Sequence, residues 1–207
     1  HGAAIAERSV WFQFTLSNTD YMGAGKLLVD MLERDNDSRL NIYFLGSGTT
    51  DIIGVSPGDS VQNASMLNIT GHYGMQWEPE FVSWYENSFI QAECHYKLGN
   101  EGLALAKLNE TLDGIEERWQ GLGFSSASVP RYSDISGEEL FAAIMNEKYK
   151  ALFLNMQSWS DWRRTGYPNF IDSETNSTEC GDASDGNGVP RRLLYPEKEL
   201  SLIHISE

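Results

Sequence analysis

Cysteine and basic residues are both scarce in this sequence. The two cysteines, Cys94 and Cys180, lie far apart and form no CxxC pair, so neither a disulfide framework nor a metal site is predicted. Fifteen Lys and Arg face thirty Asp and Glu, which gives a formal net charge of −15. Such a field repels polyanions, so we expect no nucleic-acid partner. A Gly-rich phosphate loop is also missing, and no cofactor is expected.

Long apolar runs are missing as well. A membrane-spanning helix needs about 20 consecutive, mostly apolar residues. The sequence has no such run, and it shows neither a signal peptide nor a lipid-bearing cysteine motif. A cytoplasmic protein would fit this observation. A piece of a longer chain would fit it equally well, because His1 already stands in sequence of structured character.

The sequence does contain enough apolar material for a core. Hydrophobic residues make up 41% of the chain, charged residues 22% and aromatic residues 12%, which is a globular composition. We expect most of the aromatic rings to lie in the core. The remaining rings would offer flat apolar faces at the surface.

A pair of amphipathic helices is predicted between residues 79 and 121. The first begins near Pro79, a residue tolerated in a first helical turn, and closes at Gly99. The second follows Asn100, a capping residue type, and ends near Gly121. Their apolar faces are Phe81, Tyr85, Phe89, Ala92 and Tyr96, and Leu105, Leu108, Leu112, Ile115 and Trp119. This pattern predicts an antiparallel hairpin of tetratricopeptide type, which buries its apolar face only against neighbouring units.

One long amphipathic helix after Ser136 is predicted to be such a neighbour. Ser136 and Glu139 match a capping box, Gly166 suits a left-handed residue past the last turn, and Pro168 prevents continuation. The apolar face of this helix is Phe141, Met145, Tyr149, Leu152, Met156 and Trp159. Together these elements predict a mainly α fold of stacked helix hairpins with long loops and a few short strands.

Three regions are expected along the chain. Residues 1–80 are loop-rich, with a short helix at 27–32 and a strand at 41–45, and they are a possible ligand face. Residues 81–202 are mainly helical but include an acidic loop at about 172–188. Because that loop lacks EF-hand spacing, a solvated loop is favoured there over a calcium site.

Several residue strings, taken in order, resemble those of one protein family. Tyr85–Gly99 is similar to YxExxFIxAExxxxLG. Ile144–Pro168 runs from an I-x-x-E/Q-K/R-Y helix into D-x-R-R-T-G-x-P, and Pro190–Leu200 resembles R-x-x-YPxxE. A weaker match runs from Ser17 to Arg39. These strings resemble the SusD/RagB-type nutrient-binding lipoproteins of the Bacteroidetes outer membrane.

The resemblance implies a truncated SusD-like α/α superhelix. It implies binding of an oligosaccharide at the cell surface and its delivery to a SusC-type TonB-dependent transporter, without catalysis. It also implies association with the outer membrane through a lipid anchor. Full family members are much longer than this chain, so we expect the anchor and part of the ligand face to be missing from it. The tail at 203–207 departs from the family pattern.

Candidate ligand residues are rings in predicted loops, because stiff aromatic planes cover the apolar faces of sugars. These rings are Trp77, Tyr73, Tyr43 and Trp11, with Asn68 and Gln76 as hydroxyl partners. For each ring the competing interpretation is packing beneath its loop. The family motifs assign no ligand residue to this chain.

Two other functional classes remain open. Asp161, Arg163 and Arg164 could suggest catalysis, but such a group near a helix end is more often an ion pair that fixes the following turn. A glycosidase needs two carboxylates about 5–9 Å apart, and Glu86 and Glu93 share one helix face. A helical-repeat adaptor for a peptide or protein is the main alternative to glycan binding.

Overall fold

The computed structural model describes residues 8–18, 22–46, 51–56 and 60–169. These residues form seven helices and two short strands, which confirms the mainly α fold. The helices are α1 (Val10–Ser17), α2 (Lys26–Arg34), α3 (Arg39–Tyr43), α4 (Trp84–Lys97), α5 (Glu101–Gly121), α6 (Gly137–Ala151) and α7 (Gln157–Thr165), with a 3-10 turn η2 (Val61–Asn63). Strands β1 (Phe44–Leu45) and β2 (Met66–Leu67) pair antiparallel, with Phe44 opposite Leu67.

His1–Pro168 form one compact unit, and the second unit begins at Asn169. The acidic loop, the motif at 190–200 and the tail at 203–207 lie outside the described residues. The three-region division stays a prediction. Among the helices that the structure describes, none combines the length and apolar character that crossing a membrane requires.

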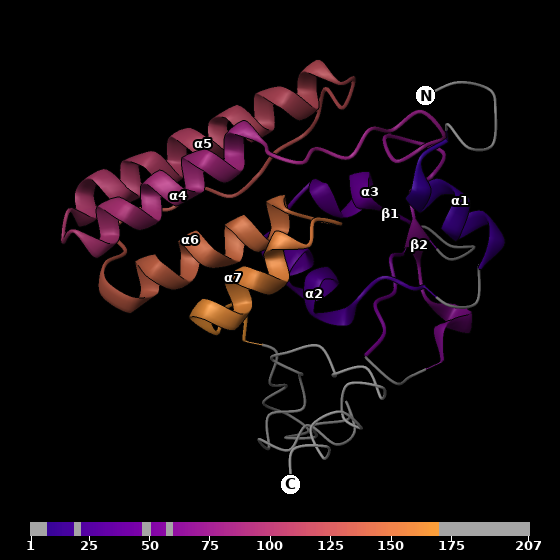
Figure 1. Cartoon of the computed structure of the whole chain (residues 1–207), viewed down its shortest axis with the longest axis horizontal. Helices are drawn as coiled ribbons and strands as arrows, with labels where there is room; N and C mark the ends of the chain where they lie inside the picture. Colours follow the sequence, from indigo (N-terminus) through magenta and orange to yellow (C-terminus); the bar gives the residue numbers. More distant parts are fainter. Residues whose placement is uncertain (1–7, 19–21, 47–50, 57–59, 170–207) are drawn as a thin grey trace, which may run out of the picture. The chain divides into compact units, whose positions relative to one another are not determined.

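The predicted hairpin is present as α4 and α5, which run antiparallel side by side (Figure 1). Leu108 and Leu112 of α5 are fully buried, and Gly99 takes the left-handed conformation (φ 77°) between the helices. The predicted start of α4 near Pro79 is wrong. The Ser83 hydroxyl accepts a hydrogen bond from the Glu86 amide (3.1 Å) and caps the helix there, so Phe81 stays outside the helix and is 95% exposed.

The prediction of a single long helix after Ser136 is wrong, because α6 ends at Ala151 and α7 begins at Gln157. Leu154 adopts a left-handed φ of 63°, which breaks the helix. The Asn155 side chain then accepts from the Gln157 amide (2.9 Å), and α7 runs back along α6 (Figure 1). Met156, expected on the apolar face, is 87% exposed.

The start of α6 also differs from its prediction. Ser136 is the N-cap residue, but its side chain makes no capping hydrogen bond. The Gly137 amide instead donates to the carboxylate of Glu101 (3.2 Å), at the start of α5. The first turn of α6 is therefore tied to the hairpin by a long-range contact, not by the local capping box.

The strand predicted at 41–45 is mostly helical, because residues 39–43 form α3 and β1 is confined to Phe44–Leu45. The Asp37 carboxylate accepts from the backbone amide of Arg39 (3.0 Å), which favours a turn at the helix start. The same carboxylate binds the Arg39 guanidinium, so the turn and the side chain are fixed together.

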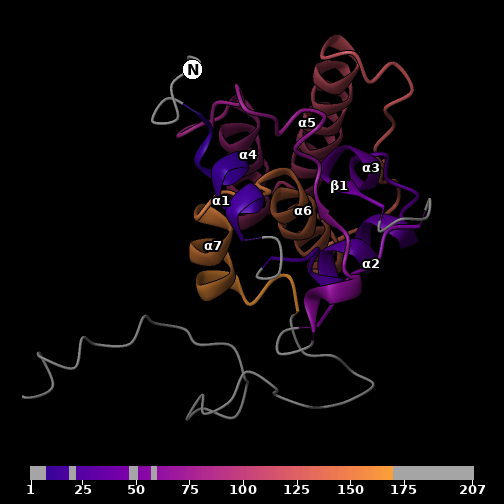
Figure 2. The same cartoon turned by 90° about the vertical axis from the view of Figure 1, so that its right-hand side faces the viewer.

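Helix α6 is the central element, with α4, α5 and α7 around it (Figure 2). A buried ion network joins it to α3: the Arg39 guanidinium binds Glu147, and Lys150 Nζ lies 2.6 Å from the same carboxylate. All three side chains are fully buried. The Tyr132 hydroxyl donates to Glu147 (2.7 Å), and Lys150 also pairs with Asp35. Helix α6 is thus held to the N-terminal elements by charge as well as by apolar packing.

Candidate functional site

Eight aromatic side chains surround an opening of about 400 Å³, here called the aromatic pocket. Its walls come from α1, the loop before α4, the facing sides of α4 and α5, and the connection between α6 and α7. The rings that line it are Trp11, His72, Tyr73, Trp77, Phe81, Tyr85, Trp119 and Phe153. The break in the predicted long helix therefore supplies part of this site.

Three of the candidate rings meet at the aromatic pocket: Trp77, Tyr73 and Trp11. Trp77 and Trp11 are half-buried, so part of each ring is offered to a ligand. The prediction that the Tyr73 ring is exposed is wrong, because Tyr73 is only 4% exposed. It packs edge-on to Trp77 at 5.0 Å between ring centroids and is a wall of the pocket. Gln76 is exposed and lines a depression that shares Trp77 with the aromatic pocket.

Tyr43 and Asn68 do not line this pocket as the structure describes it. The prediction that Tyr43 lies in a loop is wrong, because it belongs to α3 and is 1% exposed. Its hydroxyl donates to the Lys150 carbonyl (2.9 Å). The Asn68 side chain accepts from the Gly71 amide (2.9 Å) and donates to a main-chain carbonyl, so it holds its own turn.

The sequence-based prediction missed the polar part of the pocket. Arg118 donates to one Glu80 carboxylate oxygen (2.9 Å), and the Tyr85 hydroxyl donates to the other (2.8 Å). The Arg118 guanidinium lies over the Trp119 ring at 5.1 Å. Because Tyr85 and Trp119 fit the apolar faces of the hairpin, periodicity alone marked them as core residues. Nothing in the local sequence pairs Glu80 with Arg118, which is 38 positions away.

Burial changes the acidity of several side chains at this pocket, His72 and Tyr85 among them. Burial first, and then the nearby charge of Arg118, lowers the pKa of His72 to about 4. His72 is therefore neutral at pH 7 and has one ring nitrogen to donate and one to accept. Burial, followed by the hydrogen bond to Glu80, raises the pKa of Tyr85 to about 12, so Tyr85 keeps its proton and remains a donor.

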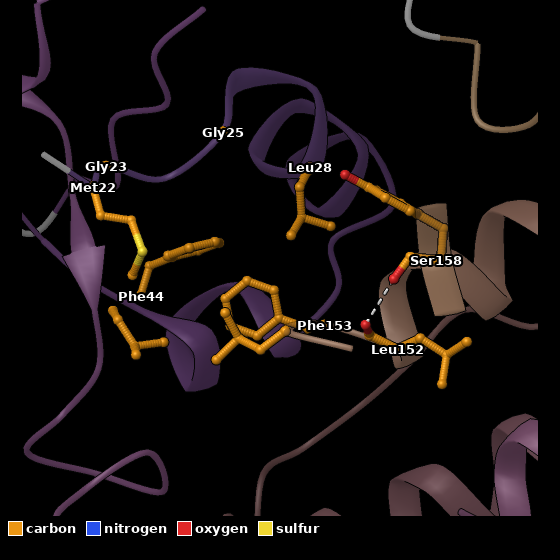
Figure 3. Close-up of a pocket in the computed structure, with 11 residues that line it drawn as sticks. Met22, Gly23, Gly25, Leu28, Phe44, Leu152, Phe153 and Ser158 are labelled. Carbon is orange, nitrogen blue, oxygen red and sulfur yellow. Dashed lines mark hydrogen bonds between the residues drawn. The ribbon is translucent and has the colours of Figure 1, made fainter. Parts of the chain in front are cut away.

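A second, smaller pocket of about 230 Å³ lies between α2, β1 and the connection of α6 to α7 (Figure 3). Leu28, Phe44 and Phe153 lie around it, and most of its described lining is apolar. The Ser158 hydroxyl at its edge donates to the Leu152 carbonyl (3.1 Å). This pocket offers a hydroxyl-rich ligand fewer polar partners than the aromatic pocket does.

The carboxylates considered for a glycosidase lie elsewhere. Glu86 and Glu93 are both on α4, and neither is among the described residues that line the aromatic pocket. Arg164 donates through both terminal nitrogens to the Glu93 carboxylate. Glu93 is thus part of an ion pair between α4 and α7.

The residues around Asp161 form a compact group of charges. The Asp161 carboxylate lies 2.7 Å from both Lys148 Nζ and an Arg164 nitrogen. Arg163 instead lies over the Trp159 ring at 4.6 Å. Glu147 belongs to the network of Arg39 and is not a partner of Arg164. Gly166 ends α7 with a left-handed φ of 79°, and Pro168 follows it. This arrangement joins α4, α6 and α7.

Comparison with known proteins identifies the family. The model of a SusD-like family, described as "Starch-binding associating with outer membrane", matches residues 2–196. The chain belongs to the SusD-like family. A solved chitin-binding protein matches this SusD-like chain with a TM-score of 0.64 and 22% identity, over 90% of the chain and 46% of that protein. The chain therefore spans less than half of that protein's length. No curated protein matches its sequence.

The strings that carried the SusD-like resemblance build mainly the scaffold in the described part of the structure. Glu93 of the first string and Arg164 of the second bind each other. Glu147 of the second string binds Arg39 from the weaker match near the N-terminus. The motif residues thus fix how the helices pack, whereas Trp11 and Trp77 of the pocket lie outside the strings.

Proposed function

We propose that this SusD-like chain binds an oligosaccharide in the aromatic pocket at the surface of the outer membrane and releases it, chemically unchanged, to a SusC-type TonB-dependent transporter. The observation that carries the proposal is the meeting of half-buried Trp11 and Trp77 with a polar edge formed by Glu80 and Arg118. Flat rings suit the C–H faces of a sugar, and fixed polar groups suit its hydroxyls. Attachment through a lipid anchor belongs to the same proposal.

Area arguments give the expected strength of such a site. At about 25 cal/mol per Å² of apolar surface removed from water, one well-covered sugar face gives roughly 1–2 kcal/mol. Several rings are therefore needed to offset the cost of immobilising the ligand. The aromatic pocket offers two half-buried indole rings and exposed Phe81 at its edge. In this proposal the loop-rich residues 1–80 supply much of the ligand face, because Trp11, Trp77 and the His72–Tyr73 pair come from that region.

The test is a binding screen with purified protein against soluble neutral polysaccharides, such as starch, cellulose and chitin derivatives. We expect saturable binding to at least one polymer and no increase in reducing ends during incubation. Release of reducing ends would replace the proposal with a glycosidase. Binding confined to peptides would favour the adaptor.

Delivery to a transporter needs a separate experiment. Co-expression with a SusC-type transporter encoded beside this protein should give a complex that co-purifies from outer membranes. A protein that binds glycan but never associates with such a transporter would keep the binding part of the proposal and remove the delivery part.

A further inference from the structure

Glu80 is the acidic group held in the described wall of the aromatic pocket. Each of its carboxylate oxygens already accepts one hydrogen bond, from Arg118 at 2.9 Å and from the Tyr85 hydroxyl at 2.8 Å. A carboxylate oxygen has capacity for a second donor. The side chain is 39% exposed and lines the pocket, so this capacity remains available to a ligand. Two partners therefore fix a negatively charged acceptor where a ligand would lie.

The positive charge beside Glu80 is already engaged. Arg118 binds the Glu80 carboxylate, and its guanidinium lies over the Trp119 and Tyr85 rings at 5.1 and 5.7 Å. His72, the other basic side chain that lines the described pocket, is neutral at pH 7 because burial lowers its pKa to about 4. Arg118, the only charged cation in the described lining of the aromatic pocket, is thus committed to Glu80.

We infer that Glu80 makes the aromatic pocket select uncharged, hydroxyl-rich glycans and reject carboxylated ones; the inference rests on the proposed glycan-binding function. A sugar hydroxyl that donates to the Glu80 carboxylate gains a charge-assisted hydrogen bond, which is stronger than a bond between neutral groups. A ligand carboxylate at the same place meets a like charge and has no uncommitted cation to compensate it.

The test compares size-matched substituents on one polymer backbone. Hydroxyethyl and carboxymethyl forms of starch, cellulose and chitin are titrated calorimetrically into the protein at about 0.15 M salt, where distant surface charges are screened beyond about 8 Å. For each backbone that binds, we expect the carboxymethyl form to bind at least roughly tenfold more weakly than the hydroxyethyl form. The Glu80→Gln variant should reduce that ratio to about threefold or less, because it removes the charge and releases Arg118.

Two further variants separate a local effect from the charge of the whole chain. Glu33 is an exposed acid of α2 that lies outside the described lining of the pocket. Glu33→Gln removes the same amount of charge as Glu80→Gln and should leave the ratio of the two affinities unchanged. Arg118→Gln leaves the Glu80 charge uncompensated and should increase the ratio. Thermal melting confirms that each variant is folded.

The outcomes separate this inference from the proposed function. Equal binding of both polymer forms by the unmodified protein would overturn the selectivity. If Glu33→Gln lowers the ratio of hydroxyethyl to carboxymethyl binding as much as Glu80→Gln does, the role of Glu80 is overturned. If no hydroxyethyl polymer binds at all, the glycan-binding function itself is wrong.

Discussion

Trp77 has the position expected of a ligand residue, because it is held by neighbouring rings without being enclosed. Its ring lies 5.0 Å from that of Tyr73 and 6.4 Å from that of His72, and the residue is half-buried. Tyr43 stacks on Phe153 at 4.5 Å inside the core. Two rings that both look like surface candidates in the sequence thus have different environments.

The Trp77→Ala substitution should weaken glycan binding more than it weakens the fold. Loss of one covered sugar face removes about 1–2 kcal/mol, which is about a 5- to 30-fold increase in Kd. Titration calorimetry with a polymer that binds the unmodified protein measures this change. Trp159→Ala, on α7 and outside the described lining of the pocket, is the matched control and should leave Kd unchanged. Equal losses of affinity in both variants would contradict a direct role for Trp77.

Glu147 is a fully buried acid of α6 that pairs with Arg39 and Lys150. Glu147→Gln leaves Arg39 and Lys150 buried with one fewer negative charge, so we expect a loss of about 3–5 kcal/mol in the free energy of unfolding. Urea titration measures it. Glu110→Gln removes an exposed partner of Lys107 and should cost less than about 1 kcal/mol. Similar losses in the free energy of unfolding for the two substitutions would show that burial does not determine how much an ion pair stabilises the protein.

At the level of the helices, Gly114 of α5 faces Trp84 of α4. A Cβ atom added at Gly114 would lie 2.6 Å from the Trp84 indole. At Gly102, on the same helix, an added Cβ would meet open space. Two glycines of one helix therefore differ in what their missing side chain allows.

Alanine substitutions at these two glycines should have opposite effects on stability. Gly102→Ala gains helix propensity and should raise the free energy of unfolding by up to about 1 kcal/mol. Gly114→Ala gains the same propensity but forces the indole of Trp84 to move, and overpacking typically costs about 1–3 kcal/mol. Thermal melting of both variants measures the difference. A stabilised Gly114→Ala protein would mean that the Trp84 ring moves away without cost.

The whole unit should lose stability in acid, because the network around α6 contains ionised carboxylates. Burial alone would raise the pKa of Glu147, but the charges of Arg39 and Lys150 and their hydrogen bonds lower it below its usual value of 4.5. The pKa of Asp35 is also lowered: burial opposes the shift, and hydrogen bonds from Arg34 and Lys150 outweigh it. The stabilising contribution is therefore complete above about pH 4.5. It is lost as pH falls through the lower pKa values of the folded state.

Thermal melting between pH 7 and pH 3 should therefore show a falling Tm below about pH 4.5. Acidification also reduces the net charge of −15, and this change alone would relieve repulsion and raise Tm. We expect the loss of the buried network to outweigh that relief. The Glu147→Gln variant should show a shallower acid decline, because one of the responsible groups is gone. A Tm that rises on acidification would show that overall repulsion dominates.

The sequence by itself determined the elements whose signals are local. Three- and four-residue spacing at Leu108, Leu112 and Ile115 predicted the hairpin, and the ordered family strings predicted the SusD-like fold. The break at Leu154 was not predicted, because the apolar spacing continues through it and a left-handed residue other than glycine has no strong local signal.

Only the tertiary structure decided which rings form a site. Trp11, Trp77 and Phe153 are far apart along the chain, and they line one pocket because α6 ends early and α7 turns back. The Glu80–Arg118 pair likewise joins a loop to the far end of α5. Periodicity reports which face of a helix is apolar. Whether a given ring on that face is enclosed or offered to a ligand depends on what packs against it, and that is a property of the folded chain.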